Sequence, residues 1–328
     1  MATFQLRAYQ KGDEARINAG FNEIFQRRRS LEEWFWKFEP QRRRSEIAVA
    51  VDAGGDVIAQ YAATAVELNV DGRRYRAGQP VDVFCRPLAE ARQGRLFVKT
   101  VLFFFSRFAT PACLPILYGF PGERALRLGK SKLGYQHHRP VRAWRRAVRG
   151  PRLRWPKLRL RGAPTRFQVR AVPDPGAVDQ LWRRCAPRYP VAIARDSVWL
   201  ERRFGSHPDA PYRYFGVHDH ERLRAWVVLR FAGDTARWVD LLWDGDDPAA
   251  LTTLQEHLAR VARRRGSTGF ELWMAGDAAI EAQLPALGWI PETGPQLPDF
   301  AVRSFDPTIG GGWLLKNFYY TLADTDLA

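Results

Sequence analysis

The sequence predicts a mixed α/β protein built from two successive units of similar layout, and three observations support this expectation. A length of 328 residues accommodates two domains of about 150 residues each. A hydrophobic fraction of 46%, with 13% aromatic residues, is sufficient for hydrophobic cores and excludes a disordered chain. One order of strands and helices also recurs in both halves, which indicates a tandem duplication.

The first half opens with a short strand at 4–9 and a helix at 13–25, whose residues Ile17, Phe21 and Ile24 form an apolar stripe. Ser30-Leu31-Glu32-Glu33 fits a capping box at the start of a second helix. The remaining expected elements are strands at 46–52, 57–70 and 73–85, a helix at 94–108, a strand at 114–120 and a helix at 124–133.

The second half repeats this order. We expect a strand at 167–172, helices at 176–186 and 196–204, strands at 212–218, 223–231 and 236–243, a helix at 248–265, a strand at 270–275, a helix at 278–287 and closing strands from 289 onward. The predicted organisation is therefore an N-terminal unit at 1–150, a basic linker at 151–165 and a C-terminal unit at 166–328.

The positive charge lies almost entirely in the first half. Residues 1–161 contain 32 Lys and Arg against 14 Asp and Glu, whereas residues 162–328 contain 19 against 21. The densest segment, Arg139–Arg161, holds ten basic residues in 23. It is either a solvated linker or a surface for an anionic partner, such as a membrane surface, an acidic carrier protein or an anionic glycan. No recognisable nucleic-acid-binding motif accompanies it.

Several classes of protein are excluded by what the sequence lacks. The three cysteines share no short spacing, which argues against a disulfide scaffold and a cysteine-based zinc site. The pair His218 and His220 offers too few ligands, so we expect no metal. No apolar run approaches the roughly 18 residues of a transmembrane segment, and the first residues do not form a signal peptide. We therefore expect a cytoplasmic protein.

Motifs between residues 79 and 135 point to a family. The strand Gln79–Pro87 is followed by Arg92-Gln93-Gly94-Arg95-Leu96-Phe97, and further on stand Leu117-Tyr-Gly-Phe-Pro-Gly122 and Lys132-Leu-Gly-Tyr135. These stretches resemble the fourth strand, pyrophosphate loop and following signature of the GNAT superfamily of acyltransferases, in a bacterial subgroup with two tandem GNAT-like domains. The resemblance implies two mostly antiparallel sheets flanked by helices, and links the subgroup to biosynthesis.

The resemblance also implies a donor site and a reaction. The donor would be acetyl-CoA or a longer acyl-CoA, or an acidic acyl carrier protein, and an amine or hydroxyl would attack its thioester directly. Amides at the start of the helix near Gly94 would bind the pyrophosphate. The donor-binding residues implied are Val83, Phe84, Cys85, Arg92, Gln93, Gly94, Arg95, Leu96 and Phe97. Gln93 and Arg95 stand where relatives usually carry glycine.

Four residues are candidates for acid–base catalysis. Asp82 lies inside an otherwise apolar strand, and Glu67, near the end of the preceding strand, occupies a position where many relatives keep a base. Tyr118 and Tyr135 are candidate proton donors to the leaving thiolate. Each of the four also has a purely structural interpretation. Cys85 as a covalent nucleophile is disfavoured because no histidine stands near it in sequence.

Two rival functions remain open. The arginine-rich half would suit aminoacyl transfer from tRNA, as in Fem-type enzymes, which also pair two such domains. Alternatively, the altered loop would suit a catalytically degenerate scaffold or binding module. In the second half, Asp240, Asp244, Asp246 and Asp247 stand where a donor loop is expected and would repel a pyrophosphate. That half is therefore expected to shape the acceptor cleft.

Overall fold

The computed structural model describes residues 4–39, 45–87, 90–148, 166–170, 174–208, 211–292, 294 and 297–326, with the backbone alone at 90–94. The chain divides into two compact units that are not consecutive in sequence. Unit 1 comprises Met1–Leu68, Arg74–Pro140 and Pro298–Lys316, and unit 2 comprises Asn69–Arg73, Val141–Leu297 and Asn317–Ala328. The linker expected at 151–165 lies outside the described residues, so the domain boundary drawn there stays a prediction.

Unit 1 is a sheet with helices on both faces. Its elements are β1 (Phe4–Ala8), α1 (Glu14–Phe25), α2 (Leu31–Phe38), β2 (Ser45–Asp52), β3 (Val57–Val70), β4 (Arg73–Cys85), α3 (Glu90–Phe108), β5 (Ile116–Gly119), α4 (Glu123–Lys132), β6 (His137–Pro140), β15 (Asp299–Ser304) and α9 (Gly311–Asn317), with the β3–β4 tip and the last residue of α9 assigned to unit 2. The strand order is β1-β2-β3-β4-β5-β15-β6.

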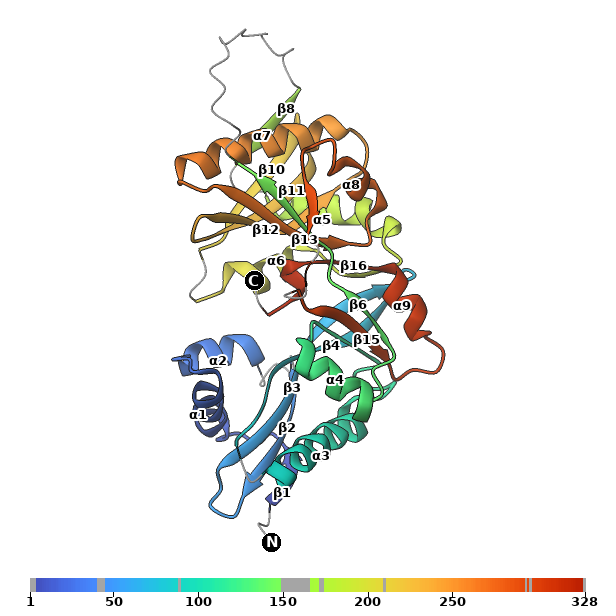
Figure 1. Ribbon diagram of the computed structural model, residues 1–328. Coiled ribbons are helices and arrows are strands. Elements are labelled where there is room, and N and C mark those ends of the chain that lie inside the picture. Colours follow the sequence, from blue (N-terminus) through green and yellow to red (C-terminus); the bar gives the residue numbers. More distant parts are fainter. Residues whose placement is uncertain are drawn as a thin grey trace. The chain divides into compact units, whose positions relative to one another are not determined.

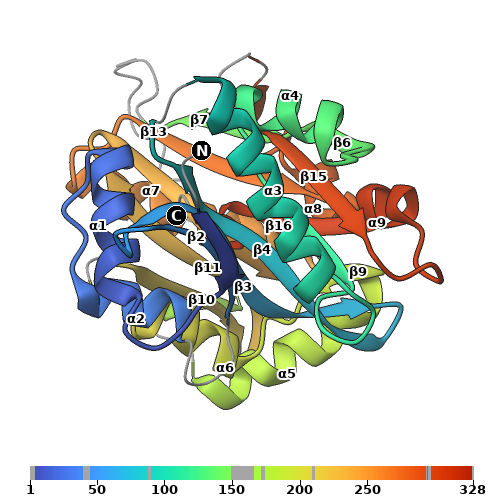
Figure 2. The same cartoon turned by 90° about the horizontal axis from the view of Figure 1, so that it is seen from below.

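Hydrophobic clusters pack on both faces of the unit 1 sheet. Ile17 of α1 and Trp34 and Phe38 of α2 are fully buried against β2, β3 and β4. On the opposite face, Phe104 and Phe105 of α3 pack on β2, β3 and β5, and Leu133 and Tyr135, which follow α4, join them. Figures 1 and 2 show α1 and α2 on one side of this sheet and α3 and α4 on the other.

Unit 2 repeats the element order of unit 1. Its elements are β7 (Ala143–Ala147), β8 (Phe167–Arg170), α5 (Pro175–Cys185), η2 (Ala186–Arg188), β9 (Val191–Ile193), α6 (Ser197–Leu200), η3 (Glu201–Gly205), β10 (Arg213–Asp219), β11 (Arg222–Ala232), β12 (Thr235–Trp243), α7 (Pro248–Arg264), β13 (Gly269–Ala275), α8 (Ala278–Gln283), β14 (Ile290–Glu292), β16 (Phe318–Thr321) and η4 (Leu322–Asp324). In each unit a strand, two helices, three strands, a helix, a strand and a helix follow in this order, with the short β9 added between the two helices of unit 2. The repeated order and the mixed α/β class are thereby confirmed.

Late strands complete both sheets in a way that local patterns do not reveal. β15 pairs with β5 through Ala301–Ser304 and separates it from β6. In unit 2, β7 pairs antiparallel with β13, and β14 then pairs with β7. Each sheet thus receives a strand from a distant part of the chain.

The helix expected at 94–108 begins earlier, at Glu90. Glu90-Ala91-Arg92-Gln93 are residues with high helix propensity, so they extend the helix by one turn toward β4. Gly94 is therefore inside the second turn. The capping serine of α2 is where the sequence places it, because the Ser30 side chain accepts a hydrogen bond from the Glu33 amide at 3.0 Å.

Candidate functional site

An opening between two parallel strands is the main irregularity of the unit 1 sheet. β4 and β5 pair only at Ala77 with Ile116 and at Gly78 with Leu117. The described residues of β4 beyond Gly78 have no partner strand on the β5 side. Pro80 explains part of this, because proline cannot donate a backbone hydrogen bond to a neighbouring strand. The strands therefore separate from Gln79 and Tyr118 onward.

Asp82 marks a second cause of the opening. Its φ of 51° is in the left-handed region, which interrupts the regular pleat of β4. The Gln60 side chain of β3 donates a hydrogen bond to the Asp82 carbonyl at 2.9 Å and so holds this irregular backbone. The strain is thus fixed by specific contacts in the middle of the sheet.

The Asp82 side chain is buried and bound by two cations. Arg29 donates to one carboxylate oxygen in a short ion pair, and Lys37 binds the other at 2.6 Å. Each carboxylate oxygen of Asp82 therefore has a cation as its partner. Arg29 is itself only 6% exposed and stacks on Phe21. The position of Asp82 inside an otherwise apolar strand is the sequence feature that indicates buried cationic partners such as Arg29 and Lys37.

The other predicted catalytic residues lie in different settings. Glu67 is exposed and pairs with Arg74 at 2.6 Å. Tyr118 of β5 is buried, and its hydroxyl donates to the Gln79 side chain of β4 at 3.5 Å, just where the two strands separate. Of the four candidates, Tyr118 is the one whose hydroxyl lies where β4 and β5 stop pairing.

Tyr135 belongs to the packed face beneath α3 and α4. Its ring lies against Gly129 of α4, and its hydroxyl is 3.4 Å from that of Tyr61. Burial raises the pKa of Tyr135, and the nearby Arg303 opposes this rise. Arg303 comes from β15 and stacks between Phe105 and Phe305. The sequence analysis missed Tyr61 and Arg303, because only the pairing of β15 with β5 brings Arg303 here.

The implied donor-binding residues divide between β4 and α3. Val83 and Cys85 are half-buried, whereas Phe84 is buried against Gly20 of α1. On α3, Leu96 is buried, Phe97 is half-buried and Arg95 is exposed. The structure describes Arg92, Gln93 and Gly94 only as helix backbone. Because an α-helix leaves its first four amides without helical partners, the free amides of α3 belong to 90–93 instead of Gly94.

Cys85 has the environment of an inert thiol. Burial raises its pKa, so the thiolate that would attack a thioester is scarce near neutral pH.

Two helix N-termini face the same edge of the sheet as the opening. β4 ends at Cys85 and α3 begins at Glu90, while β5 ends at Gly119 and α4 begins at Glu123. Since β4 and β5 are parallel, both helices start at the edge toward which the strands separate. The N-cap of α4 is Gly122, which supplies no side-chain hydrogen bond to the helix amides. Both helix dipoles therefore place partial positive charge at this edge.

The corresponding region of unit 2 is filled. β12 and β13 are parallel and pair at Thr235–Trp238 with Gly269–Leu272. Beyond this point, β16 pairs with β13 through Tyr320 and Thr321. The Tyr319 hydroxyl donates to the Leu241 carbonyl, so β16 is tied to β12 as well. The helices that follow are capped by their own carboxylates, α7 by Asp247 and α8 by Asp277.

The four aspartates at the end of β12 are neutralised by arginines. Asp240 pairs with Arg195, and Asp247 with Arg166, each at 3.0 Å. Asp244 and Asp246 both pair with Arg224, at 3.3 and 2.8 Å. The cluster is therefore not the uncompensated negative charge expected from sequence. Instead, β16 pairs with β13 beyond the end of the β12–β13 pairing, and side chains of the chain itself cap α7 and α8.

The described part of the basic segment at 139–161 is also largely paired. Arg142 forms an ion pair with Glu281 at 2.6 Å, and Arg145 with Glu292 at 2.5 Å. Arg146 donates to the Leu287 carbonyl at 2.8 Å. These arginines dock β7 within unit 2. The remainder of the segment, from 149 onward, lies outside the described residues.

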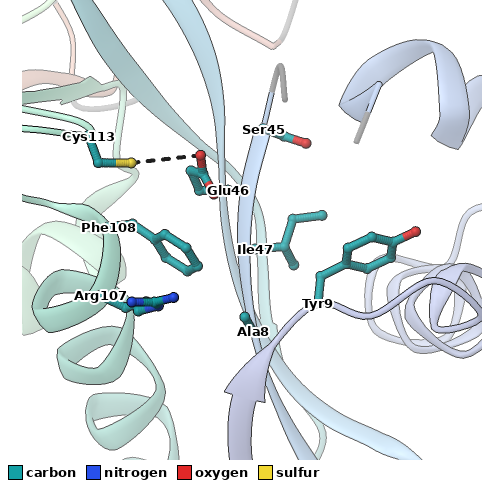
Figure 3. A pocket seen from close by; sticks show the side chains of 8 residues that line it. All are labelled: Ala8, Tyr9, Ser45, Glu46, Ile47, Arg107, Phe108 and Cys113. Carbon is teal, nitrogen blue, oxygen red and sulfur yellow. Dashed lines mark hydrogen bonds between the residues drawn. The ribbon is translucent and has the colours of Figure 1, made fainter. Parts of the chain in front are cut away.

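A pocket of about 400 Å³ lies elsewhere in unit 1, at the start of β2 and the end of α3 (Figure 3). It is lined by Ala8, Tyr9, Ser45, Glu46, Ile47, Arg107, Phe108 and Cys113. Glu46 pairs with Arg76 at 3.0 Å, and burial and Glu46 raise the pKa of Cys113. None of the predicted site residues lines this pocket.

Among the residues that the structure describes, no three His, Cys, Asp or Glu side chains gather closely enough to bind a metal ion. None of the described helices combines the length and apolar character required to cross a membrane.

The sequence matches one family model, and the fold is similar to several solved structures. The family model described as "Acetyltransferase (GNAT) domain" matches residues 5–97. A probable N-acyltransferase from Enterococcus faecalis is 14% identical, with a TM-score of 0.68 over 93% of this chain and 73% of that one. A GCN5-related N-acetyltransferase from Anabaena variabilis is 12% identical, with the same TM-score and coverage.

A more distant similarity is to N-myristoyltransferase from Saccharomyces cerevisiae, solved with bound myristoyl-CoA. It is 13% identical, with a TM-score of 0.55 over 95% of this chain and 87% of that one. No curated protein matches the sequence. At these identities the solved structures establish the fold, which is shared along nearly the whole chain.

Proposed function

We propose that the chain is an acyltransferase whose donor site is the opening between β4 and β5 in unit 1, because a GNAT acetyltransferase model matches residues 5–97 and the fold is similar to that of solved N-acetyltransferases. The donor is an acyl thioester carried on phosphopantetheine, as acetyl-CoA, a longer acyl-CoA or an acyl carrier protein. The acceptor is an amine or a hydroxyl. Its lone pair attacks the thioester carbonyl, and the thiolate leaves.

The observation that carries this proposal is the difference between the two units. In unit 1, β4 loses its β5 partner after Gly78, and the edge of an extended strand then offers amides and carbonyls to a ligand. A pantetheine arm has two amide groups that can pair with such an edge. In unit 2, β16 already fills the equivalent region. Within the described residues, unit 1 is therefore the unit to which we assign the arm.

The helices at the mouth of the opening suit the phosphates of the donor. Helix N-termini bind anions through free backbone amides and the positive end of the dipole. The first turn of α3, at 90–93, follows β4 directly, and α4 starts with an uncapped glycine. Phosphopantetheine would thus extend from these helix ends into the opening.

Within this proposal each predicted catalytic residue receives a role from its contacts. Tyr118 is the proton donor to the leaving thiolate, because its hydroxyl lies where β4 and β5 separate. Asp82 is a positioning residue that, with Arg29 and Lys37, fixes α1 and α2 against the irregular part of β4. Glu67 is an exposed ion-pair partner, and Tyr135 is a packing residue.

A binding and turnover experiment tests the proposal. The protein is incubated with CoA thioesters of increasing chain length, and release of the free thiol is followed together with the mass of the intact protein. We expect thiol release that depends on an amine or hydroxyl acceptor and no stable acyl adduct on Cys85, whose raised pKa disfavours covalent catalysis.

A variant that fills the opening provides the structural control. A side chain added at Gly119 of β5 would approach Pro80 of β4. Gly119→Phe is therefore expected to abolish donor binding, whereas Ala249→Phe, at an exposed position on α7, is expected to leave it unchanged. Donor binding that survives in Gly119→Phe would place the site elsewhere.

A further inference from the structure

The outer faces of α3 and α4 form a positively charged surface. Lys99 and Leu102 are exposed on α3, as are Arg124, Arg127 and Lys130 on α4. Both helices cover the same side of the unit 1 sheet (Figures 1 and 2). We call these five residues, together with the exposed Arg95 of α3, the basic face.

Little negative charge balances this surface. Between residues 90 and 132 the sequence has eight basic and two acidic residues. Glu123 reaches Arg127 at 3.7 Å, in a pair whose side chains are both highly exposed. Lys99, Arg124 and Lys130 form no ion pair with any other described residue. Such a field attracts an anionic partner and accelerates its association.

The basic face lies beside the mouth of the proposed donor site. α3 and α4 both begin at the edge toward which β4 and β5 separate. Arg124 lies on the first turn of α4 and Arg95 on the second turn of α3, and the other basic residues follow along the two helices. A partner bound to these helices would therefore be positioned to pass a flexible arm into the opening.

We propose that the basic face docks an acidic carrier protein that presents the acyl group on a phosphopantetheine arm. This inference rests on the proposed function and commits it to a protein-bound donor. Leu102, 49% exposed, supplies an apolar contact between the basic residues, as in a protein interface with a charged rim. RNA is a poorer fit, because single-stranded RNA is bound by stacking on aromatic side chains, and no large aromatic residue is exposed on the described parts of α3 and α4.

Charge reversal with two matched donors tests the proposal. The triple variant Lys99→Glu, Arg127→Glu, Lys130→Glu, which leaves the first turns of α3 and α4 unchanged, is assayed with an acyl carrier protein and with acyl-phosphopantetheine, which has the arm without protein or nucleotide. We expect kcat/KM for the carrier-bound donor to fall by at least about tenfold. The value for acyl-phosphopantetheine should stay within about twofold. The control Arg183→Glu, Arg260→Glu, Arg264→Glu, at exposed positions of unit 2, should leave both values unchanged.

Direct binding separates failure of this inference from failure of the proposed function. A fluorescently labelled holo-acyl carrier protein should bind the wild type, and the triple variant should lose that binding, even if no acceptor has been found. Turnover of acyl-phosphopantetheine without any carrier binding would overturn the inference and leave the function intact. Equal displacement of the carrier by tRNA or by anionic phospholipid vesicles would also overturn it, because the face would then recognise charge alone.

Discussion

Asp82 combines a left-handed backbone with a carboxylate bound by Arg29 and Lys37. A buried carboxylate stays ionised only when nearby cations compensate the loss of hydration. Here the compensation also links the loop after α1, and α2 itself, to the middle of β4. The residue thus connects the packing of two helices to the geometry of the proposed donor slot.

Replacing Asp82 should therefore lower the stability of the fold, because the residue acts through its ion pairs and not as a catalytic group. Asp82→Asn leaves Arg29 buried without its charge partner, and we expect the free energy of unfolding to fall by about 3 kcal/mol. Glu67→Gln is the matched control, since the exposed pair with Arg74 should contribute less than about 1 kcal/mol. Chemical denaturation followed by tryptophan fluorescence measures both. Full stability of Asp82→Asn with lost turnover would instead indicate a catalytic base.

The Tyr118 hydroxyl lies beside the Gln79 side chain, where β4 and β5 separate. If its hydroxyl protonates the leaving thiolate, Tyr118→Phe should lower kcat by about a hundredfold with little change in the donor KM. Tyr75→Phe, on the same sheet but in the first part of β4, should leave kcat unchanged. Steady-state kinetics across a pH series measures this. An unchanged kcat in Tyr118→Phe would remove the residue from the mechanism.

Among the elements, β16 distinguishes the two units most clearly. It is fixed by a fully buried network in which Arg195 binds Asp240 at 3.0 Å and Asp324 at 2.6 Å. Thr321 of β16 donates to Asp240 at 2.6 Å. Desolvation and the proximity of Asp324 outweigh Arg195 and raise the pKa of Asp240 from 3.8 to about 6.

This raised pKa predicts a dependence of stability on pH. The folded state binds the Asp240 proton more tightly than the unfolded state does, so its contribution to stability is complete below the ordinary pKa. The contribution is lost as the pH rises through about 6. Urea unfolding of the wild type and of Asp240→Asn between about pH 4 and pH 7 measures it. The wild type should lose stability over this range relative to the variant, and parallel curves would contradict the assignment.

Local patterns in the sequence anticipated elements better than their assembly. The Ser30 cap and the order of strands and helices follow from short-range periodicity and capping, which the sequence displays directly. α3 begins four residues before the expected position 94, because the helix-forming residues 90–93 extend it past Gly94. The insertion of β15 beside β5, and of β16 beside β13, depends on pairings between distant segments. No local pattern encodes these.

The same limit applies to the candidate site. The resemblance placed the donor site on β4 and α3, and the family model, which ends at Phe97 within α3, leaves that placement a prediction. It did not reveal that Asp82 is paired, because Arg29 and Lys37 are far from it in sequence. Nor did the acidic end of β12 indicate that arginines neutralise it.

At the scale of the whole molecule, the two units share one order of elements but differ in what lies between the paired parallel strands. In unit 1 the strands separate beside two helix N-termini and a basic face, whereas in unit 2 the chain fills the gap itself. The charge of +16 is concentrated in the half of the sequence that contains the open slot. Donor binding should thus be a property of unit 1 alone.

Equilibrium binding of acyl-phosphopantetheine, the arm that both CoA and carrier-protein donors contain, measured by calorimetry, tests this central claim most directly. We predict one bound molecule per chain in the wild type, none in Gly119→Phe and one in Ala249→Phe. Two bound molecules per chain, or undiminished binding by Gly119→Phe, would contradict the assignment of the donor slot to β4 and β5.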